Sequence, residues 1–100
     1  MSAQSLTALH HANQVRSARA AIREQVRAGQ VHVLDAIRDP RMDTMRAAEA
    51  LRWTPYGADG RRTAPYVVRQ WLQAAGATEM VACGHLTERQ HRVLREVIPS

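Results

Sequence analysis

The stretch that decides the fold is RSARAAIREQVRAG, residues 16–29. Its arginines recur at the spacing of one helix face and, at about 100° per residue, fall within a sector of roughly 80°: Arg16, Arg19, Arg23 and Arg27. Apolar residues fill the neighbouring sector: Val15, Ala18, Ile22 and Val26. The pattern predicts a helix from about Ser5 to Ala28, ended by Gly29. One stripe would face the core while the other presents arginines.

Two short helices are predicted after Gly29. The first fits residues 31–38 and is closed by Asp39-Pro40, because proline disfavours a helical residue before it. The second fits residues 43–52, with Asp43 or Thr44 as its cap. The next stretch, residues 54–62, holds one proline and two glycines, which indicate a turn.

Two longer helices are predicted in the last third of the chain. Thr63 is expected to cap the first, which has Pro65 in its first turn and Gly76 at its end. The second follows a capping box formed by Thr87 and Gln90. It runs to about Ile98, with three residues facing inward: Leu94, Val97 and Ile98. No stretch alternates with the period of a strand, so an all-α fold of about five helices is predicted.

The charge of the chain is positive and unevenly distributed. All fourteen cations are arginine and the formal net charge is +5. Two explanations for the absence of lysine stay open: a GC-rich coding bias, and selection of arginine for phosphate binding. The coding bias does not explain the excess of positive charge. Residues 1–30 carry +3, residues 31–60 carry −1 and residues 61–100 carry +3. An excess of this kind favours a polyanionic partner.

Several function classes find no support in the sequence. Cys83 is the only cysteine, and it has neither a disulfide partner nor metal-ligand spacing to the histidines. No nucleophile motif, phosphate loop or apolar carboxylate pair is present, so no catalytic residue, metal or cofactor is expected. There is no apolar run of about 18 residues and no signal peptide, which predicts a cytoplasmic protein without membrane contact. Trp53 and Trp71 lie on apolar faces and are expected in the core.

The first candidate phosphate site is the turn at residues 57–63. Glycine lets a backbone approach a phosphate closely, and the amides at the start of the next helix would point at the anion. The residues concerned are Gly57, Gly60, Arg61, Arg62 and Thr63. The alternative is an exposed loop that only joins two helices.

The second candidate site is the arginine stripe at residues 16–27. Only Glu24 offers it a local counter-charge. A helix with such a stripe can lie along a duplex and contact successive phosphates. The alternative is a solvated helix face.

Four segments together resemble the actinobacterial, or mycobacterial-type, integration host factors, which are small nucleoid-associated proteins. The segments are RSARAAIREQVRAG at 16–29, MRAAEAL at 45–51, GRRTA at 60–64 followed by Val67-Val68, and GHLTERQ at 84–90. Arg46, in the second segment, joins the predicted DNA-binding set. The second half of the chain is also similar to the helix-two-turns-helix module of a small-subunit ribosomal protein, over LTERQ at 86–90 and LREVI at 94–98.

The resemblance, which covers about residues 12–98, implies a fold and a function. A basic N-terminal helix, residues 1–30, would pack on a helix-two-turns-helix body, residues 31–100, in one module. The protein would be a monomer in the nucleoid that binds double-stranded DNA through its phosphates, with little sequence preference, and bends or compacts it or assists a phage recombinase. Here the turn is about two residues longer, and Glu79–Cys83 replaces a basic cluster of the family.

Two other functions stay open at the level of the sequence. The ribosomal similarity favours binding of structured RNA. The segment from Met80 to Cys83 is uncharged and the middle third of the chain is close to neutral, which favours a protein-interaction module that regulates a recombinase or a transcription factor.

Overall fold

The structure, a computed structural model, describes residues 3–57 and 60–99. Over these residues the chain is mainly helical, as predicted, with five α-helices, two short 3₁₀ helices and one two-stranded hairpin. The elements follow in the order α1 (Ala3–Arg27), α2 (Val33–Ala36), η1 (Pro40–Met42), α3 (Ala47–Leu51), β1 (Pro55–Tyr56), β2 (Arg61–Arg62), α4 (Pro65–Ala74), η2 (Cys83–His85) and α5 (Glu88–Val97).

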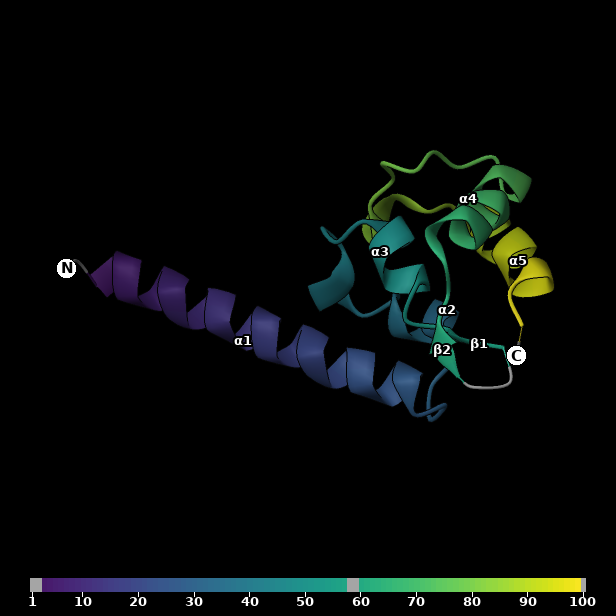
Figure 1. Cartoon of the computed structure of the whole chain (residues 1–100). Helices are drawn as coiled ribbons and strands as arrows, with labels where there is room; N and C mark the ends of the chain where they lie inside the picture. Colours follow the sequence, from purple (N-terminus) through teal and green to yellow (C-terminus); the bar gives the residue numbers. More distant parts are fainter. Residues whose placement is uncertain (1–2, 58–59, 100) are drawn as a thin grey trace.

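Helix α1 extends well beyond the other elements of the structure. At 1.5 Å per residue its 25 residues span about 37 Å, and its N-terminal part reaches away from the other elements (Figure 1). Residues 6–14 are exposed, whereas Ile22 and Val26 are buried. The predicted apolar stripe therefore packs on the body through its C-terminal half. The helix ends, as predicted, at a glycine: Gly29 adopts a φ of +73°.

The segment between α1 and the hairpin differs from its prediction. The helix predicted over 31–38 is shorter, Val33–Ala36, and His32 caps it by accepting the Leu34 amide at its Nδ1. The helix predicted over 43–52 is Ala47–Leu51, so the predicted cap at Asp43 or Thr44 is wrong. The reason is non-local: Arg46 is extended and bridges to Ala82, with the Ala47 amide donating to the Val81 carbonyl and the Cys83 amide donating to the Met45 carbonyl.

The turn predicted at residues 54–62 is a β-hairpin, which corrects the all-α prediction. Strands β1 and β2 are antiparallel, and Pro55 pairs with Arg62 while Tyr56 pairs with Arg61. Gly57 and Gly60 have φ values of +84° and +65°, which side chains disfavour. Each strand has only two residues, too few for a period-two pattern to be read from the sequence.

Helices α4 and α5 follow their predictions closely. Pro65 begins α4, and the Thr87–Gln90 capping box begins α5 with both of its hydrogen bonds formed. The predicted cap at Thr63 is wrong, because Ala64 occupies that position and the Thr63 hydroxyl donates to the Thr54 carbonyl at 2.7 Å.

The core lies between α2, α3, α4 and α5, with the C-terminal half of α1 laid against it. Trp53 and Trp71 are buried in it, as predicted, and so are Leu94 and Ile98. Val97, predicted to face inward, is exposed, and His91 is buried on the same face of α5 as Leu94.

Candidate nucleic-acid interface

Four of the predicted DNA-binding residues line one groove between α1 and α3. They are Arg16, Arg19, Arg23 and Arg46, and the groove has a volume of about 530 Å³. Three of them come from the arginine stripe of α1, and Arg46 stands at the start of α3 on the opposite side. The fold thus brings Arg46, which is 23 residues after Arg23 in the chain, next to the arginine face of α1 that the helical spacing predicted.

Three of these arginines have no partner in the part of the chain that the structure describes. The guanidinium groups of Arg16, Arg23 and Arg46 make no hydrogen bond or ion pair with any residue in 3–57 or 60–99, and the three residues are exposed. Arg16 and Arg23 are seven residues apart, so they share one face of α1 at a rise of about 10 Å. Their guanidinium groups are therefore open to an external anion.

Arg19 lies in the same groove but is held by the protein itself. Its Nε donates to the Arg41 carbonyl and its Nη2 donates to the Thr44 hydroxyl, both at 2.7 Å. These bonds join the middle of α1 to the segment between η1 and α3. Arg19 therefore positions the helix and also contributes its charge to the groove.

Arg27 lies outside the groove, which separates it from the rest of the predicted stripe. Its Nη2 donates to the Gly60 carbonyl at 2.9 Å and its Nη1 to the Trp53 carbonyl at 3.4 Å. The half-buried side chain ties the end of α1 to the hairpin. Arg27 therefore has a structural role at the hairpin, and its predicted role as a phosphate ligand stays a prediction.

The described part of the glycine turn differs from the geometry that the sequence predicted for an anion site. The Gly60 amide donates to the Gly57 carbonyl, and strand β2 separates the turn from the first residue of α4. Thr63 is fully buried, with its amide donating to Arg52, so it cannot meet a phosphate. Arg61 and Arg62 are exposed on β2 and remain basic residues at the hairpin.

Glu49 is the one acidic residue that lines the arginine groove, and the sequence analysis did not single it out. It follows Arg46 by three positions, which places the two side chains on one face of a helical segment. This spacing of three residues is the sequence signal that could have placed Glu49 beside Arg46. A carboxylate here lowers the positive potential of the groove and opposes an incoming phosphate.

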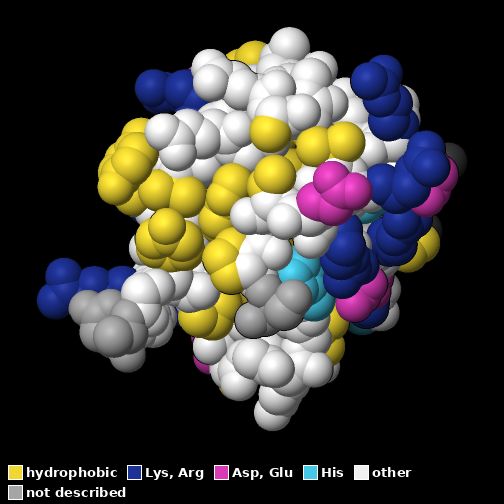
Figure 2. Space-filling view, turned by 90° about the vertical axis from the view of Figure 1, so that its right-hand side faces the viewer, with side chains coloured by type: hydrophobic (Ala, Val, Ile, Leu, Met, Phe, Trp, Pro, Cys, Tyr) yellow, Lys and Arg dark blue, Asp and Glu magenta, His cyan; other side chains and the backbone are white. Residues whose placement is uncertain are grey.

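Two arginines near α5 are bound by carboxylates: Arg38, which follows α2, and Arg95 in α5. Arg38 donates to both carboxylate oxygens of Glu88 at 2.9 and 3.1 Å, and Arg95 donates to Asp35 at 2.7 Å. These hydrogen bonds hold the pKa values of Glu88 and Asp35 below their ordinary values. Viewed from the side of α5, basic side chains alternate with acidic and histidine side chains (Figure 2).

Other reactive groups are few among the described residues. Burial raises the pKa of the Cys83 thiol to about 11, so it stays protonated at neutral pH. No group of three or more metal-ligating side chains gathers within residues 3–57 and 60–99. In the same residues, no helix has the length and apolar character needed to cross a bilayer.

Comparison of the chain with protein-family models, with curated proteins and with solved structures finds no match. The candidate site therefore stands on its own geometry.

Proposed function

We propose that this protein binds double-stranded DNA through the phosphate backbone, with the groove between α1 and α3 as the main contact and no catalytic chemistry of its own. The observation that carries the proposal is a set of three arginines in one groove that have no partner among the described residues: Arg16, Arg23 and Arg46. Arginine presents a rigid fork of donors that fits phosphate oxygens, and it stays charged at any physiological pH.

The position of the arginines favours a duplex over a small anion. Arg16 and Arg23 are separated by about 10 Å along α1, which is too far for one phosphate and suits separate phosphates of a backbone. Contacts to phosphates carry no base information, so binding would tolerate many sequences. Its strength would come from released counterions and would fall steeply with salt.

The likeness to the integration host factors belongs to the same proposal. A long basic helix, α1, precedes a pair of helices, α4 and α5, that are joined by the irregular segment 75–87. This order is what the resemblance to a helix-two-turns-helix module leads us to expect. We therefore propose a nucleoid protein that bends or compacts DNA, or that assists a recombinase at its site.

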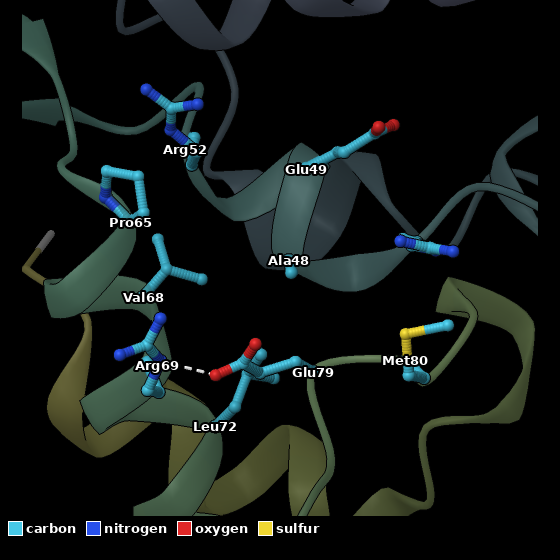
Figure 3. A pocket seen from close by; sticks show the side chains of 10 residues that line it. Ala48, Glu49, Arg52, Pro65, Val68, Arg69, Leu72, Glu79 and Met80 are labelled. Carbon is cyan, nitrogen blue, oxygen red and sulfur yellow. Dashed lines mark ion pairs between the residues drawn. The ribbon is translucent and has the colours of Figure 1, made fainter.

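A second candidate, a protein-interaction module, is favoured by a groove between α3 and α4 (Figure 3). Its volume is about 200 Å³, and Ala48, Val68 and Leu72 supply apolar surface. Met80 lines the same groove with 64% of its surface exposed. The rim is charged, and Arg69 forms an ion pair with Glu79 across it. A partner peptide with an apolar anchor would fit such a groove.

A salt titration with two nucleic acids tests the proposal. A labelled 30-base-pair DNA duplex is titrated with the full chain from about 50 to 300 mM salt, and an RNA duplex of the same sequence serves as competitor. We expect binding to DNA whose log K falls with log salt at a slope of about −3 to −6. No binding at about 50 mM salt would remove the proposal in favour of the protein-interaction candidate, and preference for RNA would redirect it to structured RNA.

A further inference from the structure

The β1–β2 hairpin adjoins one end of the arginine groove. Trp53, which lines the groove, precedes β1 by two positions in the chain. Arg27 follows Arg23 on α1 by about one helical turn. Its guanidinium donates to the carbonyls of Trp53 and Gly60, which fixes the hairpin against the end of α1 (Figure 1). A nucleic acid that follows α1 along the groove therefore reaches the hairpin at that end.

The hairpin carries an exposed aromatic side chain. Tyr56, in β1, has 44% of its surface exposed. Its ring packs edge-to-face against Trp71 of α4, with ring centroids 6.2 Å apart and planes inclined at 67°. A contact of this kind covers at most one face of the tyrosine ring. Trp71 therefore supports the ring, and the exposed part of Tyr56 is available to another aromatic group.

Three arginines lie at the same hairpin. Arg61 is the cross-strand partner of Tyr56, so the two side chains are on the same side of the hairpin. Arg62 is exposed, and it makes no hydrogen bond or ion pair with any residue in 3–57 or 60–99. Arg52 donates from its Nε to the Thr63 carbonyl at 3.2 Å, directly after β2. The positive charge beside an exposed ring favours a polyanion that also carries flat groups.

A nucleic acid with unpaired bases has both of these features. Its phosphates match the arginines, and an unpaired base of any sequence offers a face that can stack on tyrosine. Bases inside an intact duplex are stacked on one another, so their faces are not open to Tyr56. Because the hairpin adjoins the groove, the matching substrate is one in which unpaired bases lie next to a duplex.

We infer that Tyr56 stacks on an unpaired base, so that the protein prefers duplex DNA with a single-stranded gap over intact duplex DNA. The inference rests on the proposed function, because the groove between α1 and α3 holds the duplex beside the gap. Phosphate contacts in the groove do not distinguish the two kinds of DNA. Tyr56 supplies the distinction between paired and unpaired bases.

Binding to two matched DNAs tests the inference. The full chain is titrated at 100 mM salt with a labelled 30-base-pair duplex, either intact or with a central gap of three nucleotides in one strand. We expect the gapped DNA to bind at least about fivefold more tightly, which is the low end of the effect of one stacked base. Equal affinity for the two DNAs overturns the inference and leaves the proposed function standing. Binding to the gapped DNA alone supports the inference and removes the proposal for intact duplex DNA.

Variants of Tyr56 separate stacking from bending, because a gap also makes DNA easier to bend. Tyr56→Leu keeps an apolar side chain against Trp71 but removes the flat ring. It should reduce the preference for gapped DNA to less than about twofold, whereas its affinity for the intact duplex and its melting temperature should stay close to those of the unmodified protein. Tyr56→Phe keeps the ring and should keep the preference.

Tyr66→Leu is the matched control. Tyr66 is 63% exposed, but it lies about 140° around α4 from Trp71 and therefore away from the side of α4 that meets Tyr56. This variant should keep the full preference for gapped DNA. A preference that survives Tyr56→Leu, or that Tyr66→Leu removes to the same extent, overturns the assignment to Tyr56.

Discussion

The two arginine-rich faces of this molecule differ in what surrounds their charge. The groove between α1 and α3 holds four arginines and one glutamate, a net of +3. The second face is defined as the exposed charged residues of α5 together with Asp35 of α2 and Arg38, which follows α2; it comprises four arginines and three carboxylates, a net of +1: Arg38, Arg89, Arg92, Arg95, Asp35, Glu88 and Glu96. Two arginines of the second face are engaged by carboxylates, whereas three of the first have no partner among the described residues.

This difference shows why a count of arginines is a poor guide to a phosphate site. An arginine paired on a solvated face contributes little to the external potential and little to stability. The groove has a net charge of +3 because it holds a single acidic residue, Glu49.

Removing the unpartnered set should have the largest effect. The variant Arg16→Ala/Arg23→Ala/Arg46→Ala should bind a DNA duplex about 100-fold more weakly at 100 mM salt, with a salt slope smaller by about three, because three phosphate contacts are lost. Fluorescence anisotropy across a salt series measures both. An unchanged slope would mean that the groove does not meet the backbone.

Within the groove, we expect Arg19 to have a structural role and Arg16 to have a DNA-binding role. Arg19→Ala removes two hydrogen bonds that dock α1 and should lower the free energy of unfolding by about 1–2 kcal/mol. Arg16→Ala should change it by less than about 0.5 kcal/mol, since its guanidinium contacts no described residue. Urea denaturation compares the two variants, and equal losses would contradict the separation.

The face of α5 should gain DNA affinity when its carboxylates are neutralised. Asp35→Asn/Glu88→Gln releases Arg95 and Arg38 from their partners and should raise affinity about threefold at 100 mM salt. Glu49→Gln, in the groove, is the comparison variant. It removes one negative charge instead of two and should raise the affinity for DNA by a similar factor, about threefold. A gain of about tenfold or more for Asp35→Asn/Glu88→Gln would mean that the face of α5 is itself a DNA-binding site, which would contradict the proposed difference between the two faces.

The smallest effect concerns His91, which lies buried beside the arginines of α5. Burial, and then the charge of Arg38, lower the pKa of His91 from its ordinary value of 6.5. The unfolded chain therefore binds this proton more readily, so stability should fall as the pH drops below about 6.5. His91→Leu should reduce the change in melting temperature between pH 7.5 and pH 5.5. His11→Gln, on the exposed half of α1, should leave that change as it is in the unmodified protein.

Local sequence signals were sufficient for the long elements. The period of Ile22 and Val26, the Pro65 start of α4 and the Thr87–Gln90 capping box all act within one or two helical turns, and each is found where it was predicted. The elements between residues 33 and 62 were shortened or missed. Their limits depend on bonds such as that of the Cys83 amide to Met45, which joins segments 38 residues apart.

The same limit applies to the candidate site. Helical spacing identified the arginine stripe, but it could not tell which members are already used by the protein. Arg19 and Arg27 donate to carbonyls and a hydroxyl 22 to 33 residues away. Thr63 was expected at the surface, yet its hydroxyl is needed inside, against the Thr54 carbonyl. Only the tertiary structure separates unpartnered from engaged donors.

The most direct test of the account is a charge-matched comparison of the two faces. Arg16→Ala/Arg23→Ala and Arg89→Ala/Arg92→Ala remove the same charge from exposed positions on α1 and on α5. At 100 mM salt, the first variant should lose about tenfold or more in affinity for a DNA duplex and reduce the salt slope by about two. The second should lose less than about threefold. Equal losses, or a larger loss in the second variant, would contradict the placement of the interface between α1 and α3.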